Sequence, residues 1–158
     1  MSKKSSGAHY WASLNLIMGI LSLIGVMFLP YAVVNDVSRF FVWGGLAVFQ
    51  FADFYDGSLV NVPFPLVYLV LAGAIFAVIF SALAQVRSMA GRTKILSVLV
   101  STMGLAVFAG SLLIYLPMAQ AIAVELSSLA AIGIGLYLDL VAGALLFTFG
   151  IVMLLKGP

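Results

Sequence analysis

The chain has 158 residues, of which 65% are hydrophobic and 8% charged, and its mean hydropathy is +1.26. Soluble domains are about 45–50% apolar, so this composition excludes a water-soluble fold. The net charge is +2, but the basic residues flank apolar segments and form no patch, so nucleic-acid binding is not indicated.

Four apolar segments are each long enough to cross a bilayer as an α-helix. They run from about Tyr10 to Pro30, Pro63 to Val86, Ile95 to Pro117 and Leu136 to Leu155. The first segment follows Lys3 and Lys4, as a secretory signal peptide would. It is too long for one and lacks a clear small-residue cleavage site, which favours a retained helix. We therefore predict an all-α integral membrane protein, a single four-helix transmembrane bundle over residues 1–158.

The basic residues are distributed unevenly about these segments. Only Arg39 falls on one side of the four-span layout, and the others fall on the opposite side: Lys3, Lys4, Arg87, Arg92, Lys94 and Lys156. The positive-inside rule then places both termini in the cytoplasm of a multi-pass plasma-membrane protein. Residues 31–62 become a long outer loop, and residues 87–94 a short inner loop.

The outer loop is rich in aromatic side chains: Phe40, Phe41, Trp43, Phe49, Phe51, Phe54 and Tyr55. Aromatic rings favour the membrane interface, so one interpretation is a loop that lies on the bilayer surface. The other is an aromatic docking surface for a partner protein. Asp53 and Asp56 are too few oxygen ligands to indicate a calcium site.

Two segments of the chain resemble later ones in the same order. Met18-Gly19 and Leu29-Pro30 match Met103-Gly104 and Leu116-Pro117, and the run from Tyr68 to Ala74 matches Tyr137 to Ala144 with one inserted residue. This pattern indicates a duplicated helical hairpin whose copies are related by an axis along the membrane normal. Chance similarity among Leu/Ala/Gly-rich helices is the alternative.

Small residues recur at helical spacing within the apolar segments, where they let helix backbones approach closely. These residues are Gly73, Ala77 and Ser81 in the second segment, Thr102, Ala106 and Gly110 in the third, and Gly143 and Gly150 in the fourth. We expect them to pack the bundle, or to join the chain to other subunits.

Asp139 is the most informative single residue, because a carboxyl group inside an apolar span is costly and normally faces protein, water or a partner charge. At this depth it either reaches water or caps a neighbouring segment, or it meets a polar partner. Gly135 and Gly143, at i−4 and i+4, would turn it toward another helix. Glu125 is a candidate companion, since two nearby carboxyl groups can share a proton or hold a cation. Asn15 is expected to hydrogen-bond across helices and to fix their register.

The chain shows no sign of catalysis or of a bound cofactor. Cysteine is absent, which excludes disulfides and thiolate metal sites, and the single histidine, His9, excludes a bis-histidine haem. There is no phosphate-binding glycine loop, nucleophile elbow or zinc-ligand spacing. We therefore predict a protein that is not an enzyme and has no cofactor or metal.

The layout of four spans with a long first outer loop and a short second one resembles that of claudin-like proteins. Trp43-Gly44-Gly45-Leu46 is similar to the claudin pattern of a Trp before Gly-Leu-Trp and two cysteines, although Ala47 follows here. The fourth segment, from Gly135 to Gly150, also resembles the last helix of small prokaryotic tetraspan proteins. The resemblance implies a lateral or partner-binding role. Because the claudin disulfide is missing, we do not predict the claudin-type outer sheet.

These observations favour a non-catalytic tetraspan protein that serves as an accessory or scaffold subunit of a membrane assembly. Its expected partners are membrane lipids and other membrane subunits, or further copies of itself, with no nucleic acid. One alternative is a small transporter or ion-conducting homo-oligomer in which Asp139 lines a site between protomers. Another is a lipid- or quinone-binding subunit of a respiratory complex.

Overall fold

The computed structural model describes residues 5–36, 39–44, 64–86, 92–124 and 130–156. Four of its helices are long and apolar enough to cross a membrane. They are α1 (Ser5–Phe28), α3 (Phe64–Gln85), α4 (Thr93–Val124) and α5 (Ile134–Lys156). The four apolar segments predicted from the sequence are thus confirmed as helices.

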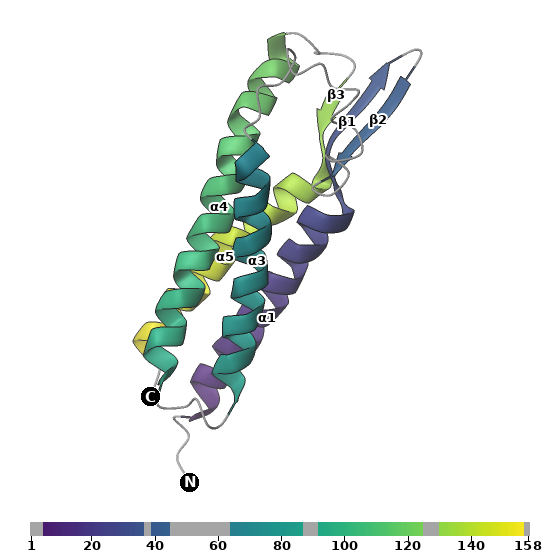
Figure 1. The fold of residues 1–158 in the computed structure, drawn as a ribbon. Helices are drawn as coiled ribbons and strands as arrows, with labels where there is room; N and C mark the ends of the chain where they lie inside the picture. Colours follow the sequence, from purple (N-terminus) through teal and green to yellow (C-terminus); the bar gives the residue numbers. More distant parts are fainter. Residues whose placement is uncertain (1–4, 37–38, 45–63, 87–91, 125–129, 157–158) are drawn as a thin grey trace.

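The helices form an elongated bundle in which neighbours run antiparallel (Figure 1). Helix α1 packs against α3 and α5, and α4 packs against the same two helices from the other side. The first residue of α1 and the last of α5 lie at the same end of the bundle, which we call the terminal end (Figure 1). The opposite end carries the strands and is called the sheet end.

The core of the bundle contains two apolar clusters. The cluster nearer the sheet end includes Val26, Val70, Val107 and Leu136. The cluster nearer the terminal end consists of Ala77, Val100 and Leu146, with Met18 packed against it. In a membrane, where lipid is as apolar as such side chains, helices associate mainly through close packing.

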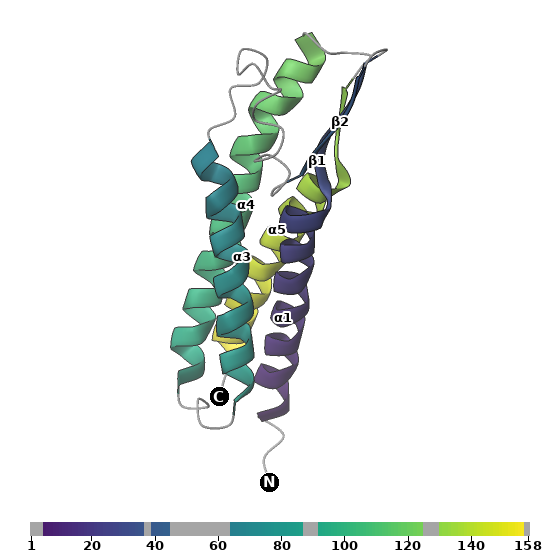
Figure 2. The same ribbon diagram turned by 45° about the vertical axis from the view of Figure 1, so that its right-hand side comes forward.

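Helix α4 is longer than the predicted third segment, which ended at Pro117. The helix continues through Pro117 to Val124 and contains 32 residues. A helix of that length is about 48 Å long, which exceeds a hydrocarbon core of about 30 Å. Proline removes only one backbone donor, so it need not end the helix. The last turns of α4 therefore extend past the other helices at the sheet end (Figures 1 and 2).

A small antiparallel sheet extends from the sheet end, and the sequence analysis did not predict it. The strands β1 (Pro30–Asp36), β2 (Arg39–Gly44) and β3 (Ala130–Ile132) are ordered β2-β1-β3. Residues 30–36 and 39–44 thus form a hairpin, whereas the sequence predicted only a loop there. Valine pairs and aromatic residues favour strands. No disulfide is needed, because β1 follows α1 directly and β3 leads directly into α5.

Two glycine contacts, one between α1 and α5 and the other between α4 and α3, have similar geometry. A Cβ added at Gly25 would lie 2.9 Å from Asp139 Oδ1, and one added at Gly110 would lie 2.9 Å from Val70 Cγ2. Extending the predicted repeat alignment from Met18/Met103 pairs Gly25 with Gly110, and the second match pairs Asp139 with Val70. Under the predicted duplication, these contacts are equivalents of each other.

Candidate functional site: a buried carboxyl at the sheet end

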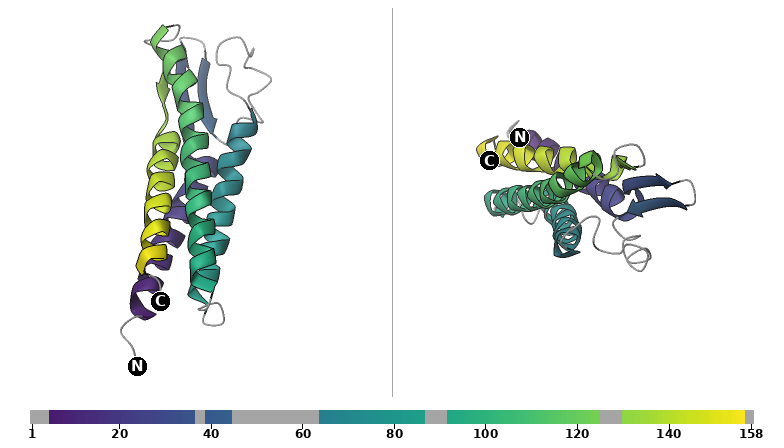
Figure 3. Two further views of the ribbon diagram at one scale, coloured as in Figure 1. Left: turned by 90° about the vertical axis from the view of Figure 1, so that its left-hand side faces the viewer. Right: turned by 90° about the horizontal axis from the view of Figure 1, so that it is seen from above.

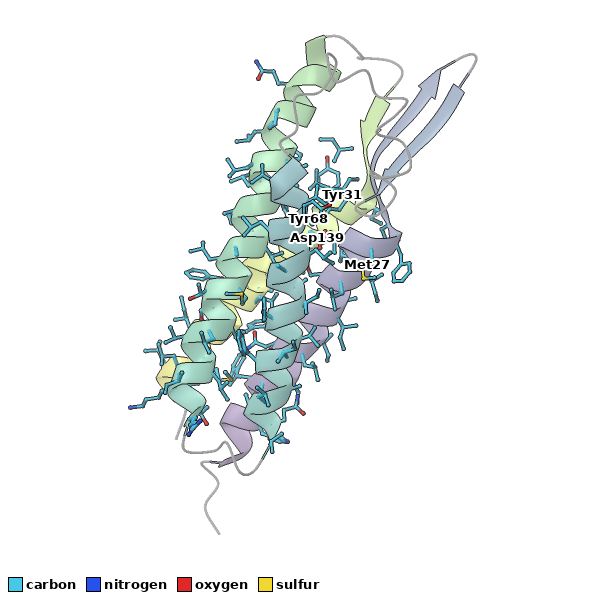
Figure 4. The ribbon with its side chains drawn as sticks, in the orientation of Figure 1. Met27, Tyr31, Tyr68 and Asp139 are labelled. Carbon is cyan, nitrogen blue, oxygen red and sulfur yellow. The ribbon has the colours of Figure 1, made fainter. Side chains whose placement is uncertain are left out.

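Asp139 lies in the second turn of α5, and its side chain is fully buried. The hydroxyl of Ser22 on α1 donates a hydrogen bond of 2.7 Å to Oδ1. The phenol of Tyr31 on β1 donates a hydrogen bond to Oδ2. Figure 4 places Tyr31 and Asp139 where α1 and α5 meet the sheet. One carboxyl group therefore links two helices and a strand.

Two glycines allow α1 and α5 to approach closely beside this carboxyl. A Cβ added at Gly135 would lie 2.8 Å from the carbonyl oxygen of Gly25 and 2.9 Å from that of Leu29. Both obstructing atoms are backbone atoms, one in α1 and one directly after it, and they cannot move aside as a flexible side chain could. The Asp139 side chain consequently fills the space that the missing side chain of Gly25 leaves.

The structure corrects the predicted surroundings of Asp139 in two ways. The side chain is 0% exposed, so the interpretation that it reaches water is wrong. Gly135 and Gly143 also face different helices, because a Cβ at Gly143 would lie 2.6 Å from the backbone nitrogen of Phe108 on α4. Asp139 does face another helix, but Gly135 alone shares its α1 side.

Tyr31 is held in place by the backbone on both sides. The amide of Leu29 donates to the carbonyl of Ile24 at 3.3 Å, and the amide of Gly133 donates to the carbonyl of Tyr31 at 2.7 Å. The fully buried ring belongs to the sheet-end apolar cluster. The chain path from α1 into β1 therefore directs the phenol into the bundle.

Burial of Tyr31 determines its protonation. Desolvation raises the pKa of the phenol well above its usual range, and the nearby charge of Asp139 and the hydrogen bond between them raise it further. The phenol therefore remains a hydrogen-bond donor over the physiological pH range.

Ser22 and Tyr31 were not recognised as site residues from the sequence. The only available signals were weak ones. Ser22 lies three residues before Gly25 and thus on the same side of α1, and Tyr31 directly follows Pro30, where the span ends. The site depends on Tyr31 near the start of strand β1, directly after α1, and helical periodicity does not reveal a strand there.

The other residues predicted near the outer loops are only partly described. Phe40, Phe41 and Trp43 belong to β2, where the structure describes the backbone. The remaining predicted residues lie outside the described residues: Glu125, Phe49, Phe51, Phe54 and Tyr55. The proposed pairing of Asp139 with Glu125 stays a prediction.

Most of the predicted small residues pack inside the bundle. Gly73 and Gly110 lie at the α3–α4 contact, Gly143 and Gly150 lie at the α4–α5 contact, and Ala77 is fully buried. Ala106 is half-buried, and Thr102 is exposed, with its hydroxyl donating to the carbonyl of Val98 at 2.9 Å. The stripe on α4 is therefore not one packing face, and Gly104, which contacts Leu146, takes its place.

Asn15 does not make the predicted hydrogen bond across helices. Its side chain is fully buried, but neither Nδ2 nor Oδ1 has a hydrogen-bond partner among the described residues. The same is true of the buried hydroxyls of Ser81 and Ser111. Asn15 and Ser81 lie in the part of the bundle near the terminal end, whereas Ser111 follows Gly110 in the part near the sheet end.

The arrangement around Asp139 has the chemistry of a structural polar contact. Both carboxyl oxygens accept hydrogen bonds from hydroxyl groups. Within the described ranges, no three His, Cys, Asp or Glu side chains are grouped to hold a metal ion. Comparison of the chain with protein-family models, curated proteins and solved structures finds no match.

Proposed function

We propose that this protein is a multi-pass plasma-membrane protein with cytoplasmic termini that acts as a non-catalytic accessory or scaffold subunit of a membrane assembly. The four apolar helices support insertion, and the distribution of basic residues supports the orientation. In this orientation the sheet end is extracellular.

The observation that carries the proposal is that Asp139 on α5 is hydrogen-bonded to both α1 and β1. A buried carboxyl group is expensive in a membrane-spanning helix, and here its two oxygens bind Ser22 of α1 and Tyr31 of β1. These hydrogen bonds fix the first strand of the sheet to two helices. A sheet held rigidly on the bundle loses little conformational entropy when a partner binds, which favours recognition.

The partner surface that we propose includes strand β2. It is an edge strand of the described sheet, because the strand order is β2-β1-β3. Its sequence contains Phe40, Phe41 and Trp43, and aromatic residues are enriched at protein interfaces. The weak claudin resemblance, which also implies lateral contacts, agrees with this proposal.

The alternative of a transporter with Asp139 between protomers receives less support. Asp139 is enclosed by α1, α5 and β1 of the same chain, and its side chain has no exposed surface. A carboxyl group that lines a path between protomers would need an exposed edge. We keep the lipid- or quinone-binding alternative as an outcome of the following experiment.

The proposal is tested by purifying the tagged protein from its native membrane in mild detergent and measuring the native mass with all bound components. We expect a stoichiometric second membrane protein. The double variant Phe41→Ala/Trp43→Ala should lower its recovery at least about ten-fold, as loss of aromatic contacts does at interfaces. The matched control, Val98→Ala/Leu105→Ala, changes two exposed side chains of α4 and should leave recovery unchanged.

Three outcomes contradict the proposal. A homo-oligomer that contains no other protein supports the transport alternative, particularly if Asp139→Asn abolishes ion flux in liposomes. A co-purified quinone or a specific lipid without a second protein supports the third alternative. Equal recovery of the second protein by the β2 variant and the α4 control removes the sheet from the interface.

A further inference from the structure

The bundle contains buried polar groups near the terminal end that no described side chain or backbone group satisfies. Asn15 on α1 and Ser81 on α3 are both 0% exposed. Neither the amide of Asn15 nor the hydroxyl of Ser81 has a hydrogen-bond partner among the described residues, and the Nε2 atom of Gln85 has none either. Buried polar groups without partners are uncommon, because each loses its hydration without replacement.

The helix contacts bring these groups into one interface. A Cβ added at Gly19 would lie 2.9 Å from Val78 Cγ2 and 3.2 Å from Val78 N, so Gly19 and Val78 face each other across α1 and α3. The two helices are antiparallel (Figure 1). Asn15 lies one turn from Gly19 toward the terminal end, and Ser81 lies about one turn from Val78 in the same direction. Both side chains therefore line the same level of the interface.

Helix α4 contributes a third polar side chain at this level. Met18, Ala77 and Val100 belong to one apolar cluster. Moving three or four residues from each toward the terminal end leads to Asn15, Ser81 and Ser97, which we call the polar layer. The Ser97 hydroxyl is fully buried and donates to the carbonyl of Thr93 at 2.7 Å, so its oxygen can still accept a hydrogen bond.

The chemical groups of the polar layer indicate which ligand it can bind. It offers amide and hydroxyl groups, which donate and accept, and it contains no carboxyl or basic side chain. Cations such as calcium require several oxygen ligands that usually include carboxylates. A buried water typically makes two to four hydrogen bonds to otherwise unsatisfied groups, which matches what this layer provides.

We propose that the polar layer is a hydration site inside the bundle. Water enters from the terminal end past Gln85, which lies one turn from Ser81 in that direction, and hydrogen-bonds to Asn15, Ser81 and Ser97. The apolar cluster of Met18, Ala77 and Val100 closes the site toward the sheet end. Hydration of the polar layer is independent of the proposed scaffold function.

Cysteine labelling tests this proposal directly, because the chain has no native cysteine. Ser81→Cys places a thiol in the polar layer. Ala77→Cys is its matched control: it lies one turn away on the same helix, is equally buried at 0% exposure, and belongs to the apolar cluster. Labelling is measured with a small cationic methanethiosulfonate reagent applied to both sides of proteoliposomes.

Only a hydrated thiol ionises readily and reacts, so Ser81→Cys should be labelled at least about ten-fold faster than Ala77→Cys. Equal labelling rates would overturn the proposal. A measurement on the unsubstituted chain covers the case in which either variant fails to fold. In its NMR spectrum, the Asn15 side-chain amide, assigned by its loss in Asn15→Leu, should exchange magnetisation with water, and an observed amide without such transfer would also overturn the proposal.

Discussion

The contact between Gly25 and Asp139 and the contact between Gly110 and Val70 solve the same packing problem in different ways. In each, the side chain of one helix fills the space left by a glycine on its neighbour, at 2.9 Å from the position of an added Cβ. Val70 fills it with methyl groups, and Asp139 fills it with a carboxyl group that accepts two hydroxyl hydrogen bonds. The apolar contact shows that packing alone does not require a carboxyl.

The carboxyl group of Asp139 therefore has a role in addition to packing. In the predicted repeat alignment, Ser22 on α1 corresponds to Val107 on α4. The hydrogen-bonded pair Ser22 and Asp139 therefore corresponds to two valines at the contact between α3 and α4. The contact between α1 and α5 is connected to strand β1 through a side-chain hydrogen bond, by way of Tyr31. Joining the sheet to the bundle is what Asp139 adds to the common packing contact.

Placing a carboxyl group at the apolar contact between α3 and α4 should cause the largest loss of stability. Val70→Asp buries a carboxyl opposite Gly110, where Val107 takes the place of the Ser22 hydroxyl. We expect a loss of about 3 kcal/mol in the free energy of unfolding in bicelles, the cost of an acidic residue within a span. Val70→Ala is the control for lost volume. The comparison fails if the aspartate costs no more than the alanine.

The reverse exchange should have a smaller effect. Asp139→Val leaves the buried hydroxyls of Ser22 and Tyr31 without their acceptor, and we expect a loss of about 2 kcal/mol. Adding Ser22→Val and Tyr31→Phe removes those orphaned donors, so the triple variant should unfold within about 1 kcal/mol of the unsubstituted chain. A triple variant less stable than Asp139→Val would show that the hydroxyls act independently of the carboxyl.

Alkaline pH should cause the next largest loss of stability, through the buried phenol of Tyr31. Burial raises the pKa of Tyr31, so the folded chain keeps the phenol protonated when the unfolded chain ionises it near pH 10. The stabilisation is complete below that pH and falls above it, by about 1.4 kcal/mol at pH 11. Tyr31→Phe should lack this part of the loss, whereas the half-exposed control Tyr137→Phe should retain it. Identical pH profiles for the two variants would contradict the account.

The smallest effect is expected in the polar layer near the terminal end. Asn15 has no direct partner among the described residues, so Asn15→Leu removes hydrogen bonds to water and leaves no protein group orphaned. We expect its free energy of unfolding to change by less than about 1 kcal/mol in either direction. A loss of 2 kcal/mol or more would mean that the amide bonds directly to protein, as Asp139 does.

The helices were predictable from the sequence because length and hydropathy are local properties. The terminal residues of α3 and α5 differ from the predicted ends by one or two positions. For α4, the sequence predicts an end at Pro117, but the helix continues to Val124, because the loss of one backbone donor does not stop a helix.

The site was only half predictable. Asp139 stands out because a carboxyl group is rare in an apolar span, but its partners come from positions 117 and 108 residues away in the chain. The sheet that delivers Tyr31 pairs β1 with β3 across most of the sequence. Such long-range pairing has no local signature in the sequence. The groups that face Asn15 across the helix contact have none either, so the sequence does not reveal that its amide lacks a hydrogen-bond partner among the described residues.

A double-mutant cycle between Tyr31→Phe and Asp139→Val most directly tests the claim that Asp139 fastens the sheet to the helices (Figure 3 shows the two parts from two further sides). The free energies of unfolding of the four proteins give the coupling between the two side chains. The account predicts a coupling of about 1.5 kcal/mol, with Tyr31→Phe destabilising the unsubstituted chain and not the Asp139→Val variant. Additive losses, with no coupling, would contradict it.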